Sequence, residues 1–130
     1  MDRLFKTKTF NRWNKGLITD QALLNAVGEM QQGLIDANLG GGVFKKRIAL
    51  PGKGKRGSAR ILLATQLKGR WFFIFGFNKN ERDNIAPTEL KQLHLLAQDL
   101  LSLNDSQLTR ALALGELMEI KYDTQKQPTD

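Results

Sequence analysis

The stretch from Ala37 to Lys79, ANLGGGVFKKRIALPGKGKRGSARILLATQLKGRWFFIFGFNK, holds most of the strand-forming sequence of this 130-residue chain. It contains ten Lys or Arg residues and no Asp or Glu, whereas the other 87 residues contain ten Lys or Arg and thirteen Asp or Glu. The net charge of +7 is therefore +10 from this stretch, which we call the basic block, and −3 from the rest. Positive charge concentrated in one segment favours a polyanionic partner, such as nucleic acid, a membrane surface or an acidic protein.

The basic block is predicted to form three strands of an antiparallel meander. Residues 43–50 and 59–67 mix apolar and basic side chains, and residues 70–78, RWFFIFGFN, are apolar on both faces, as expected of a strand inside a sheet. The dipeptide Lys68-Gly69 supplies a tight turn between the last two strands. Residues 51–58, PGKGKRGS, contain too much Gly and Pro for a central strand and predict a mobile basic loop.

The predicted strands bring several cations together. Side chains alternate along a strand, so Lys45 and Arg47 point to the same face of the sheet. Arg60 opens the second strand and Lys79 follows the third, and these two strand ends meet in an antiparallel meander. The basic loop would lie beside them.

Helices are predicted outside the basic block. Apolar residues at three- and four-residue spacing predict helices over about 20–33, from Pro87 to about 101, and over about 108–118. Residues 3–10, RLFKTKTF, predict a short strand, and Trp13 is expected to anchor a short helical turn after it.

Length and composition limit the class of protein. The chain is long enough for one domain, so we predict a single domain over residues 1–130, with a frayed polar tail from about 120 to 130. No apolar run approaches the ~20 residues of a membrane span, and the start MDRLFKTKTF lacks the apolar core of a signal peptide. Because the chain also has no Cys, we expect a cytoplasmic protein with no membrane partner.

Several kinds of active site are excluded by residue type. The chain has no Cys and one His, His94, which falls within a predicted helix, so we expect no transition metal and no other cofactor, and we interpret His94 as a helix-surface residue. GKGKRGS lacks the spacing of a phosphate-binding P-loop and leads into a strand. Ser58 lacks His and Asp partners for a triad. The basic block has no carboxylates for a paired-carboxylate site.

A cluster of cations remains, and cations can act on RNA because RNA carries its own nucleophile, the 2′-hydroxyl. Arg presents a planar fork of donors to phosphoryl oxygens. A Lys among other cations has its ammonium form disfavoured and can move a proton nearer neutral pH. The residues alone leave three functions open: RNA cleavage, passive nucleic-acid binding, and charge that only keeps the protein in solution. The cations of the cluster are Lys45, Arg47, Lys53, Lys55, Arg56, Arg60, Lys79 and Arg82.

Two segments, GGGVFKKRIALPGKGKRGSAR (40–60) and GFNKNERDNI (76–85), resemble the RelE/ParE superfamily of bacterial toxins, and more narrowly the RelE- and HigB-like toxins of type II toxin–antitoxin systems. The resemblance extends from about Leu4 to about Glu119. It implies an α+β, RelE-like fold, in which two N-terminal helical segments pack on an antiparallel twisted sheet of about four strands and two helices follow at the C-terminal end. It also implies a cognate antitoxin, usually one with a helix-turn-helix DNA-binding domain.

The resemblance further implies an activity. Nuclease members of the family cleave mRNA, usually codon by codon in the ribosomal A site. The expected function is therefore that of a metal-independent endoribonuclease, or mRNA interferase, which inhibits translation and has mRNA and the ribosome as partners.

The site residues are carried over one at a time. Arg60 matches the arginine that opens the middle strand after a basic loop, and Arg82 matches the arginine of the strand-end motif, with Lys79 just before it. Lys45, Lys53 and Lys55 lie in the region of the family's RNA-contacting lysines. We expect the following residues to be catalytic or to bind RNA: Arg60, Lys79, Arg82 and Lys55 as catalytic, and Lys45, Arg47, Lys53 and Arg56 as RNA-binding.

The sequence also departs from the family pattern. Many RelE-type members carry a tyrosine after the strand-end motif, but Ile85-Ala86-Pro87 stands there, and the single tyrosine is Tyr122. The histidines of some HigB-type members are absent as well. Base stacking then needs another residue, and the general base and general acid stay unassigned. The alternative is the ParE-like branch of the superfamily. Its members share the fold, lack this group of cations, and inhibit DNA gyrase without cleaving RNA.

Overall fold

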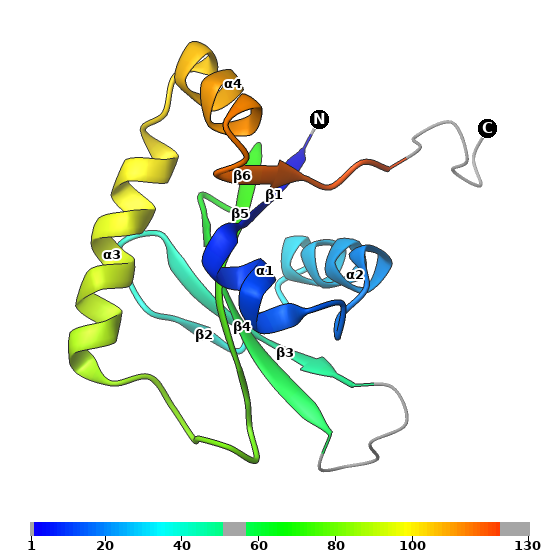
Figure 1. Ribbon diagram of the computed structural model, residues 1–130. Helices are drawn as coiled ribbons and strands as arrows, with labels where there is room; N and C mark the ends of the chain where they lie inside the picture. Colours follow the sequence, from blue (N-terminus) through cyan, green and yellow to red (C-terminus); the bar gives the residue numbers. More distant parts are fainter. Residues whose placement is uncertain (1, 51–56, 123–130) are drawn as a thin grey trace.

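The computed structural model describes residues 2–50 and 57–122. Within them the chain forms four helices and one six-stranded sheet, an α+β arrangement (Figure 1). The strands are β1 Arg3–Thr7, β2 Ala37–Asn38, β3 Val43–Ala49, β4 Ser58–Thr65, β5 Arg70–Asn78 and β6 Leu117–Glu119. The helices are α1 Lys8–Asn14, α2 Asp20–Gln31, α3 Pro87–Leu101 and α4 Asp105–Ala113.

The predicted meander forms the middle of the sheet. β3, β4 and β5 pair antiparallel in sequence order, and β5 lies inside the sheet, as its two apolar faces predicted. The strand order is β2-β3-β4-β5-β1-β6. The expected count of about four strands was wrong because β2 and β6, with two and three residues, are too short to show a periodic pattern. The sheet is also mixed, since β1 pairs with β5 in parallel.

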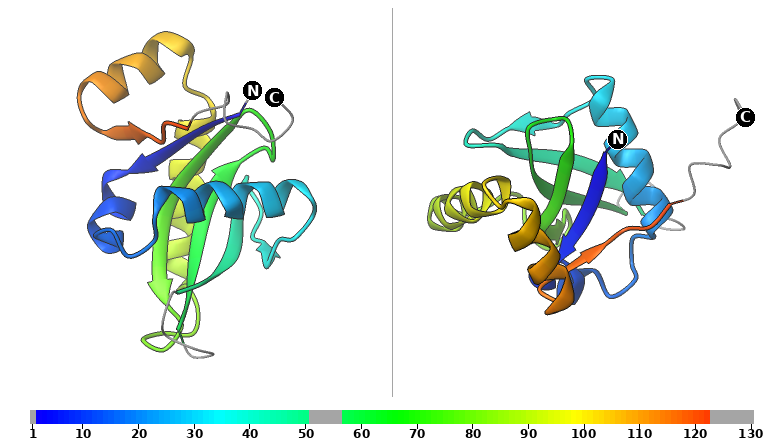
Figure 2. Two further views of the ribbon diagram at one scale, coloured as in Figure 1. Left: turned by 90° about the vertical axis from the view of Figure 1, so that its right-hand side faces the viewer. Right: turned by 90° about the horizontal axis from the view of Figure 1, so that it is seen from above.

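Helices lie on both faces of the sheet. α1 and α2 cover one face and α3 lies behind the other, as the left view of Figure 2 makes clear. The core on the first face joins α1 and α2 to Phe44, Ile48 and Phe73, and the core on the second joins α3 to Val43 and Leu62. We call these the α1/α2 face and the α3 face.

Burial along β3 differs between the two faces. Toward the α1/α2 face, Phe44, Lys46 and Ile48 are all buried. Toward the α3 face, Val43 is buried and Lys45 is partly exposed. Arg47, two residues after Lys45, is exposed. The α3 face is therefore open at the end of β3 that carries its cations.

His94 fastens α3 to the connection between β2 and β3. Its Nε2 lies 2.8 Å from the carbonyl oxygen of Leu39. Gly41, with a φ of +60°, comes so close that an added Cβ would lie 3.0 Å from the imidazole ring. These contacts support the structural interpretation of His94.

The N-terminal strand is shorter than predicted. β1 ends at Thr7, whose hydroxyl accepts a hydrogen bond from the Phe10 backbone N–H at 3.2 Å and so caps α1. The prediction of a strand through Phe10 was wrong because this cap outweighs the weak alternation that follows it. Trp13 does anchor the helical segment, since it packs against the α1/α2 core.

The C-terminal region also differs from the prediction. α4 ends at Ala113, and Gly115, with a φ of +74°, reverses the chain, so that Leu117 and Met118 lie in β6 and not in a helix. The tail is ordered further than expected because Ile120 is buried and its N–H donates to the Leu4 carbonyl at 2.9 Å. The rest of the predicted frayed tail, residues 123–130, lies outside the described residues.

No helix in the described part of the chain combines the length and the apolar character that a membrane crossing would require.

Candidate functional site

Two arginines stand directly opposite each other on neighbouring strands. Arg47 on β3 pairs in register with Arg60 on β4, and Arg60 pairs with Phe77 on β5. Opposed residues of an antiparallel pair have Cβ atoms only ~4.5–5.5 Å apart, and like charges at such positions destabilise the sheet. The three residues form a row across the α3 face, which we call the arginine row. It offers two guanidinium groups to an anion approaching that face.

One carboxylate lies beside the row. Oδ2 of Asp36 is 3.4 Å from Nε of Arg60 and 3.9 Å from Nζ of Lys45. Asp36 is held there by the sheet, because its backbone N–H donates to the Lys45 carbonyl at 2.9 Å and Ala37 pairs with Lys45. The side chains of Arg60 and Lys45 are 15% and 17% exposed, so this carboxylate neutralises groups that water reaches only in part.

Sequence reasoning missed Asp36 because it stands one residue before the basic block. The three glycines 40–42 could have revealed it, since a hairpin turning there brings the residues just before the turn back alongside the next strand.

Lys79 lies next to the start of β4, the strand that carries Arg60, as predicted. Its side chain, however, pairs with a nearby carboxylate. The Lys79 backbone N–H donates to the Ser58 carbonyl at 3.2 Å, so the ends of β4 and β5 do adjoin. Its Nζ lies 3.4 Å from Asp83, an exposed pair four residues away in sequence. Such pairs contribute little to stability, ~0–1 kcal/mol.

Arg82 is fixed from several sides. Its guanidinium binds both carboxylate oxygens of Glu89 at the start of α3, and its Nε donates to the Asn84 carbonyl at 3.1 Å. The hydrogen bond from Arg82, and next the backbone N–H of Ala86, lower the pKa of Glu89, and the same ion pair raises the pKa of Arg82. The guanidinium also lies over the rings of Phe77 and Phe75, 5.4 Å and 5.8 Å from their centroids.

The structure therefore divides the expected site residues into three groups. Lys45, Arg47 and Arg60 gather on the α3 face around Asp36, and Arg82 adjoins them through Phe77. Lys79 lies at the adjoining strand end. The remaining three, Lys53, Lys55 and Arg56, lie outside the described residues.

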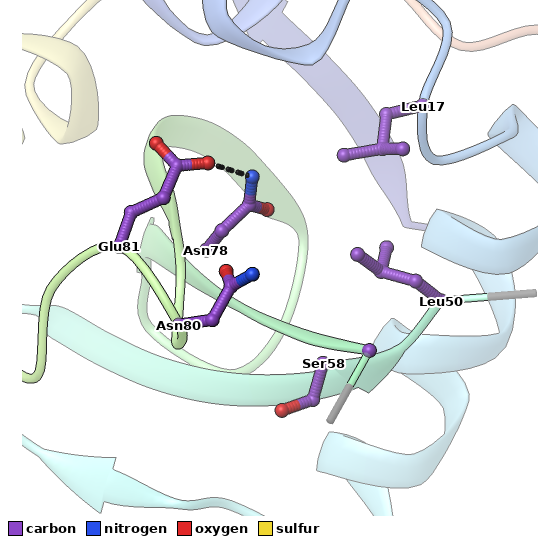
Figure 3. Close-up of a pocket in the computed structure, with 7 residues that line it drawn as sticks. Leu17, Leu50, Ser58, Asn78, Asn80 and Glu81 are labelled. Carbon is purple, nitrogen blue, oxygen red and sulfur yellow. Dashed lines mark hydrogen bonds between the residues drawn. The ribbon is translucent and has the colours of Figure 1, made fainter. Parts of the chain in front are cut away.

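A hollow of about 330 Å³ lies at the ends of the three central strands (Figure 3). Leu17 and Leu50 form an apolar side, whereas Asn78, Asn80 and Glu81 present polar groups. The Asn78 amide donates to Glu81 at 2.6 Å. Leu50 packs in the core on the α1/α2 face, so this hollow belongs to that side of the sheet and not to the arginine row.

No three His, Cys, Asp or Glu residues gather as a possible cation site within residues 2–50 and 57–122. The chemistry available at the site is that of guanidinium and ammonium groups with a carboxylate between two of them. These groups can bind a phosphate and stabilise charge on its oxygens.

The fold and the site define a class: a small α+β protein whose sheet carries a partly open cationic face. A family model described as RelE toxin of the RelE / RelB toxin–antitoxin system matches residues 2–120, and the chain belongs to this family. It is a toxin of a toxin–antitoxin system, and the family implies a cognate antitoxin as its partner. RelE-family toxins are generally ribonucleases. A comparison with curated proteins gave no match.

Proposed function

We propose that this toxin is a metal-independent endoribonuclease that cleaves mRNA on the ribosome and thereby inhibits translation. The observation that carries the proposal is the arginine row: Arg47 and Arg60 oppose each other on neighbouring strands, with one carboxylate, Asp36, bound to Arg60. A fold that needed only solubility would gain nothing from opposing two like charges. An RNA phosphate placed on the row would relieve their repulsion.

In the proposed reaction the RNA 2′-oxygen attacks the adjacent phosphorus, and the bond from phosphorus to the 5′-oxygen breaks. The products are a 2′,3′-cyclic phosphate and a free 5′-hydroxyl. A base removes the 2′-hydroxyl proton, and an acid supplies a proton to the departing 5′-oxygen. Negative charge builds on the phosphoryl oxygens in between, where donors that are already in place lower the barrier.

Each cation takes a role consistent with its surroundings. Arg60, steadied by Asp36, would stabilise the phosphoryl charge, and Arg47 would hold the RNA backbone. Lys45, Lys55 and Lys79 are the candidates for proton transfer. Arg82, which Glu89 and Asn84 hold in place, would contribute a fixed positive charge beside the row. Lys53 and Arg56 would bind backbone phosphates further along the RNA.

The wider system follows from the family. We propose an antitoxin with a helix-turn-helix DNA-binding domain that covers the α3 face or distorts it, because the toxin's cations must be kept from mRNA until needed. The proposed site of action is the cytoplasm, where ribosomes translate.

One experiment tests the activity in a bacterial host. The toxin is induced, and new 5′ ends are mapped on ribosome-bound mRNA, with Arg60→Ala induced in parallel. We expect new ends within translated codons for the wild type and none for Arg60→Ala. Growth arrest with intact transcripts would refute the nuclease, and arrest with broken chromosomes would support the gyrase inhibitor of the ParE-like branch. Purified toxin on free mRNA, with and without ribosomes, then tests the dependence on the ribosome.

A further inference from the structure

The two arginines of the arginine row stand in the closer of the two kinds of cross-strand pair. The Leu50 backbone N–H donates to the Gly57 carbonyl, and every second residue of β3 counted back from Leu50 likewise bonds to β4. Arg47 and Arg60 lie between these bonds and form a non-hydrogen-bonded pair. The Cα atoms of such a pair are only ~4.5 Å apart, and its side chains are closer than in a hydrogen-bonded pair. Both guanidinium groups can therefore reach one phosphate.

We propose that Arg47 is a catalytic residue that binds the scissile phosphate together with Arg60, one guanidinium at each non-bridging oxygen, while Arg82 stays on Glu89. The inference rests on the proposed function. It exchanges two roles that the family resemblance implies, because there Arg82 is catalytic and Arg47 only binds the RNA backbone.

Arg60 is held on two sides and has a donor left over. Its Nε lies 3.4 Å from Asp36, and its Nη1 donates to the Ser58 hydroxyl at 3.3 Å. Ser58 is buried on the same strand, and Asp36 is bound to β3 through its backbone, so both contacts come from ordered parts of the sheet. Within residues 2–50 and 57–122, Nη2 of Arg60 has no hydrogen-bond partner and is the nitrogen left for a phosphoryl oxygen.

Arg47 has its whole guanidinium to offer. It is exposed, and it forms no ion pair with any Asp or Glu in the described part of the chain. An unpaired arginine opposite a second arginine is unfavourable unless an anion lies between them. A phosphodiester has two non-bridging oxygens, and negative charge builds on both as the 2′-oxygen attacks. Donors at both oxygens stabilise that charge more than donors at one.

The donors of Arg82 are already in use. Its two terminal nitrogens bind the two carboxylate oxygens of Glu89, and its Nε donates to the Asn84 carbonyl at 3.1 Å. The Glu89 carboxylate is fixed in turn, because it accepts the backbone N–H of Ala86 at 2.9 Å. Arg82 would have to break these contacts to bind a phosphate, whereas Arg47 would break none.

The test replaces one phosphoryl oxygen at a time with sulfur. An mRNA carries a single phosphorothioate, of Rp or Sp configuration, at a bond that is cleaved in induced cells, and ribosomes present that codon in the A site. Single-turnover rates are measured with the full-length toxin. Sulfur accepts hydrogen bonds more weakly than oxygen, so each configuration should slow the wild type about 10-fold.

The two arginines should respond to opposite configurations. Arg47→Ala should slow cleavage of the unmodified mRNA about 10- to 100-fold and lose the sulfur effect of one configuration only. Arg60→Ala should lose the sulfur effect of the other. Arg47→Lys keeps the charge but not the planar fork, so it should stay about 5-fold below the wild type. It decides the question if Arg47→Ala does not fold.

Arg110→Ala is the matched control, because it removes the same charge from an exposed arginine of α4. It should leave the rate and both sulfur effects unchanged. Arg82→Ala should also keep both sulfur effects, whatever it does to stability. Thermal unfolding of every variant is measured alongside.

The outcomes separate this inference from the proposed function. If Arg47→Ala kept both sulfur effects while Arg60→Ala lost one, the assignment of Arg47 would be overturned and the nuclease would stand. A sulfur effect lost in Arg82→Ala and kept in Arg47→Ala would overturn it too and return the catalytic role to Arg82. A wild-type toxin that cut no ribosome-bound mRNA would overturn the proposed function and the inference with it.

Discussion

Two adjacent lysines mark the difference between the two faces of the sheet. Lys46 points to the α1/α2 face, where its side chain is 10% exposed and its Nζ lies 2.7 Å from Glu29 of α2. Lys45 points to the α3 face, where it and Arg60 share Asp36. The covered face thus supplies one carboxylate for its buried cation. The open face leaves an excess of positive charge around one carboxylate.

The comparison teaches where to look for function in a basic protein. Under α2 the positive charge is compensated because an uncompensated buried ion destabilises the fold. On the open part of the α3 face, water and salt reduce that cost, so the excess can persist. A local arrangement that works against stability is an indication of function. Neighbouring basic residues of one strand can therefore have different roles: Lys46 is structural on the covered face, and Lys45 belongs to the proposed site on the open face.

The largest expected effect is on the open face. Arg60→Ala should slow RNA cleavage about 10²- to 10³-fold, as removal of one preorganised donor does elsewhere. Folding should be kept, because the change removes a like-charge opposition with Arg47 and leaves Asp36 with Lys45. Lys68→Ala, an exposed cation of the same block in the connection between β4 and β5, is the control and should cleave normally. Cleavage rates and thermal unfolding measure both effects, and an unfolded Arg60→Ala would show that this arginine is structural.

The next effect tests packing on the covered face. Gly76→Ala would place a Cβ 2.3 Å from the Trp13 ring, and we expect a loss of about 1–3 kcal/mol in unfolding free energy. Gly28→Ala is the control: it lies within α2 with no atom within 4 Å of the new Cβ, and it should stabilise the protein by about 0.5–1 kcal/mol. Urea unfolding measures both. An unchanged midpoint for Gly76→Ala would contradict the close contact.

The ion pair on the covered face should matter for stability only. Glu29→Gln leaves the Lys46 ammonium without its carboxylate, and we expect a loss of about 1–2 kcal/mol with no change in RNA cleavage. Adding Lys46→Met removes the buried charge and should restore stability. If Glu29→Gln slowed cleavage without lowering stability, the assignment of Lys46 to a structural role would be wrong.

A smaller effect is expected at the shared carboxylate of the open face. Asp36→Asn removes a negative charge close to the proposed phosphate position. RNA should bind about fivefold tighter at low salt, the equivalent of ~1 kcal/mol for two charges 4 Å apart in water. Cleavage should not become faster, because Arg60 loses the group that steadies it. Binding and single-turnover rates measure the two separately, and weaker binding would refute this arrangement.

The smallest effect concerns pH. The pKa of Glu89 is lowered by its hydrogen bond from Arg82, so its contribution to stability is complete above the ordinary pKa of a glutamate, ~4.3, and is lost as the pH falls through the lowered value. In Glu89→Gln the free energy of unfolding should fall less steeply as the pH decreases through that range. Glu119→Gln, which removes the equivalent pair with Arg3 far from the row, is the comparison for RNA cleavage and should leave it unchanged.

The aromatic residues of β5 differ in burial. The Phe75 ring is half-buried, whereas Phe72 and Phe73 are completely buried, so the ~3–5 kcal/mol cost of truncating a buried ring applies to Phe72 and Phe73 and not to Phe75. The aromatic run is too uniform for sequence periodicity to separate them, because the register shift between Leu62 and Leu63 changes the alternation.

Much of the fold could be predicted because its signals are local. The meander, the start of α3 at Pro87 and the central place of β5 follow from periodicity, turn residues and apolar content over short windows. The parallel pairing of β1, the conversion of Leu117 and Met118 into β6 and the burial of Ile120 could not, because each depends on residues about fifty or more positions away along the chain.

By itself, the sequence determined that positive charge gathers on the strands of one sheet and that Lys45 and Arg47 share a face, since side-chain alternation is a property of any strand. Only the tertiary structure decided which cations are compensated. Glu29 reaches Lys46 from α2, whereas Asp36, from the hairpin before β3, is shared by Arg60 and Lys45, so positive charge is matched by a carboxylate on one face and exceeds it on the other. The physical reason is that a charge's effect depends on the carboxylates and the solvent around it, and folding alone sets both.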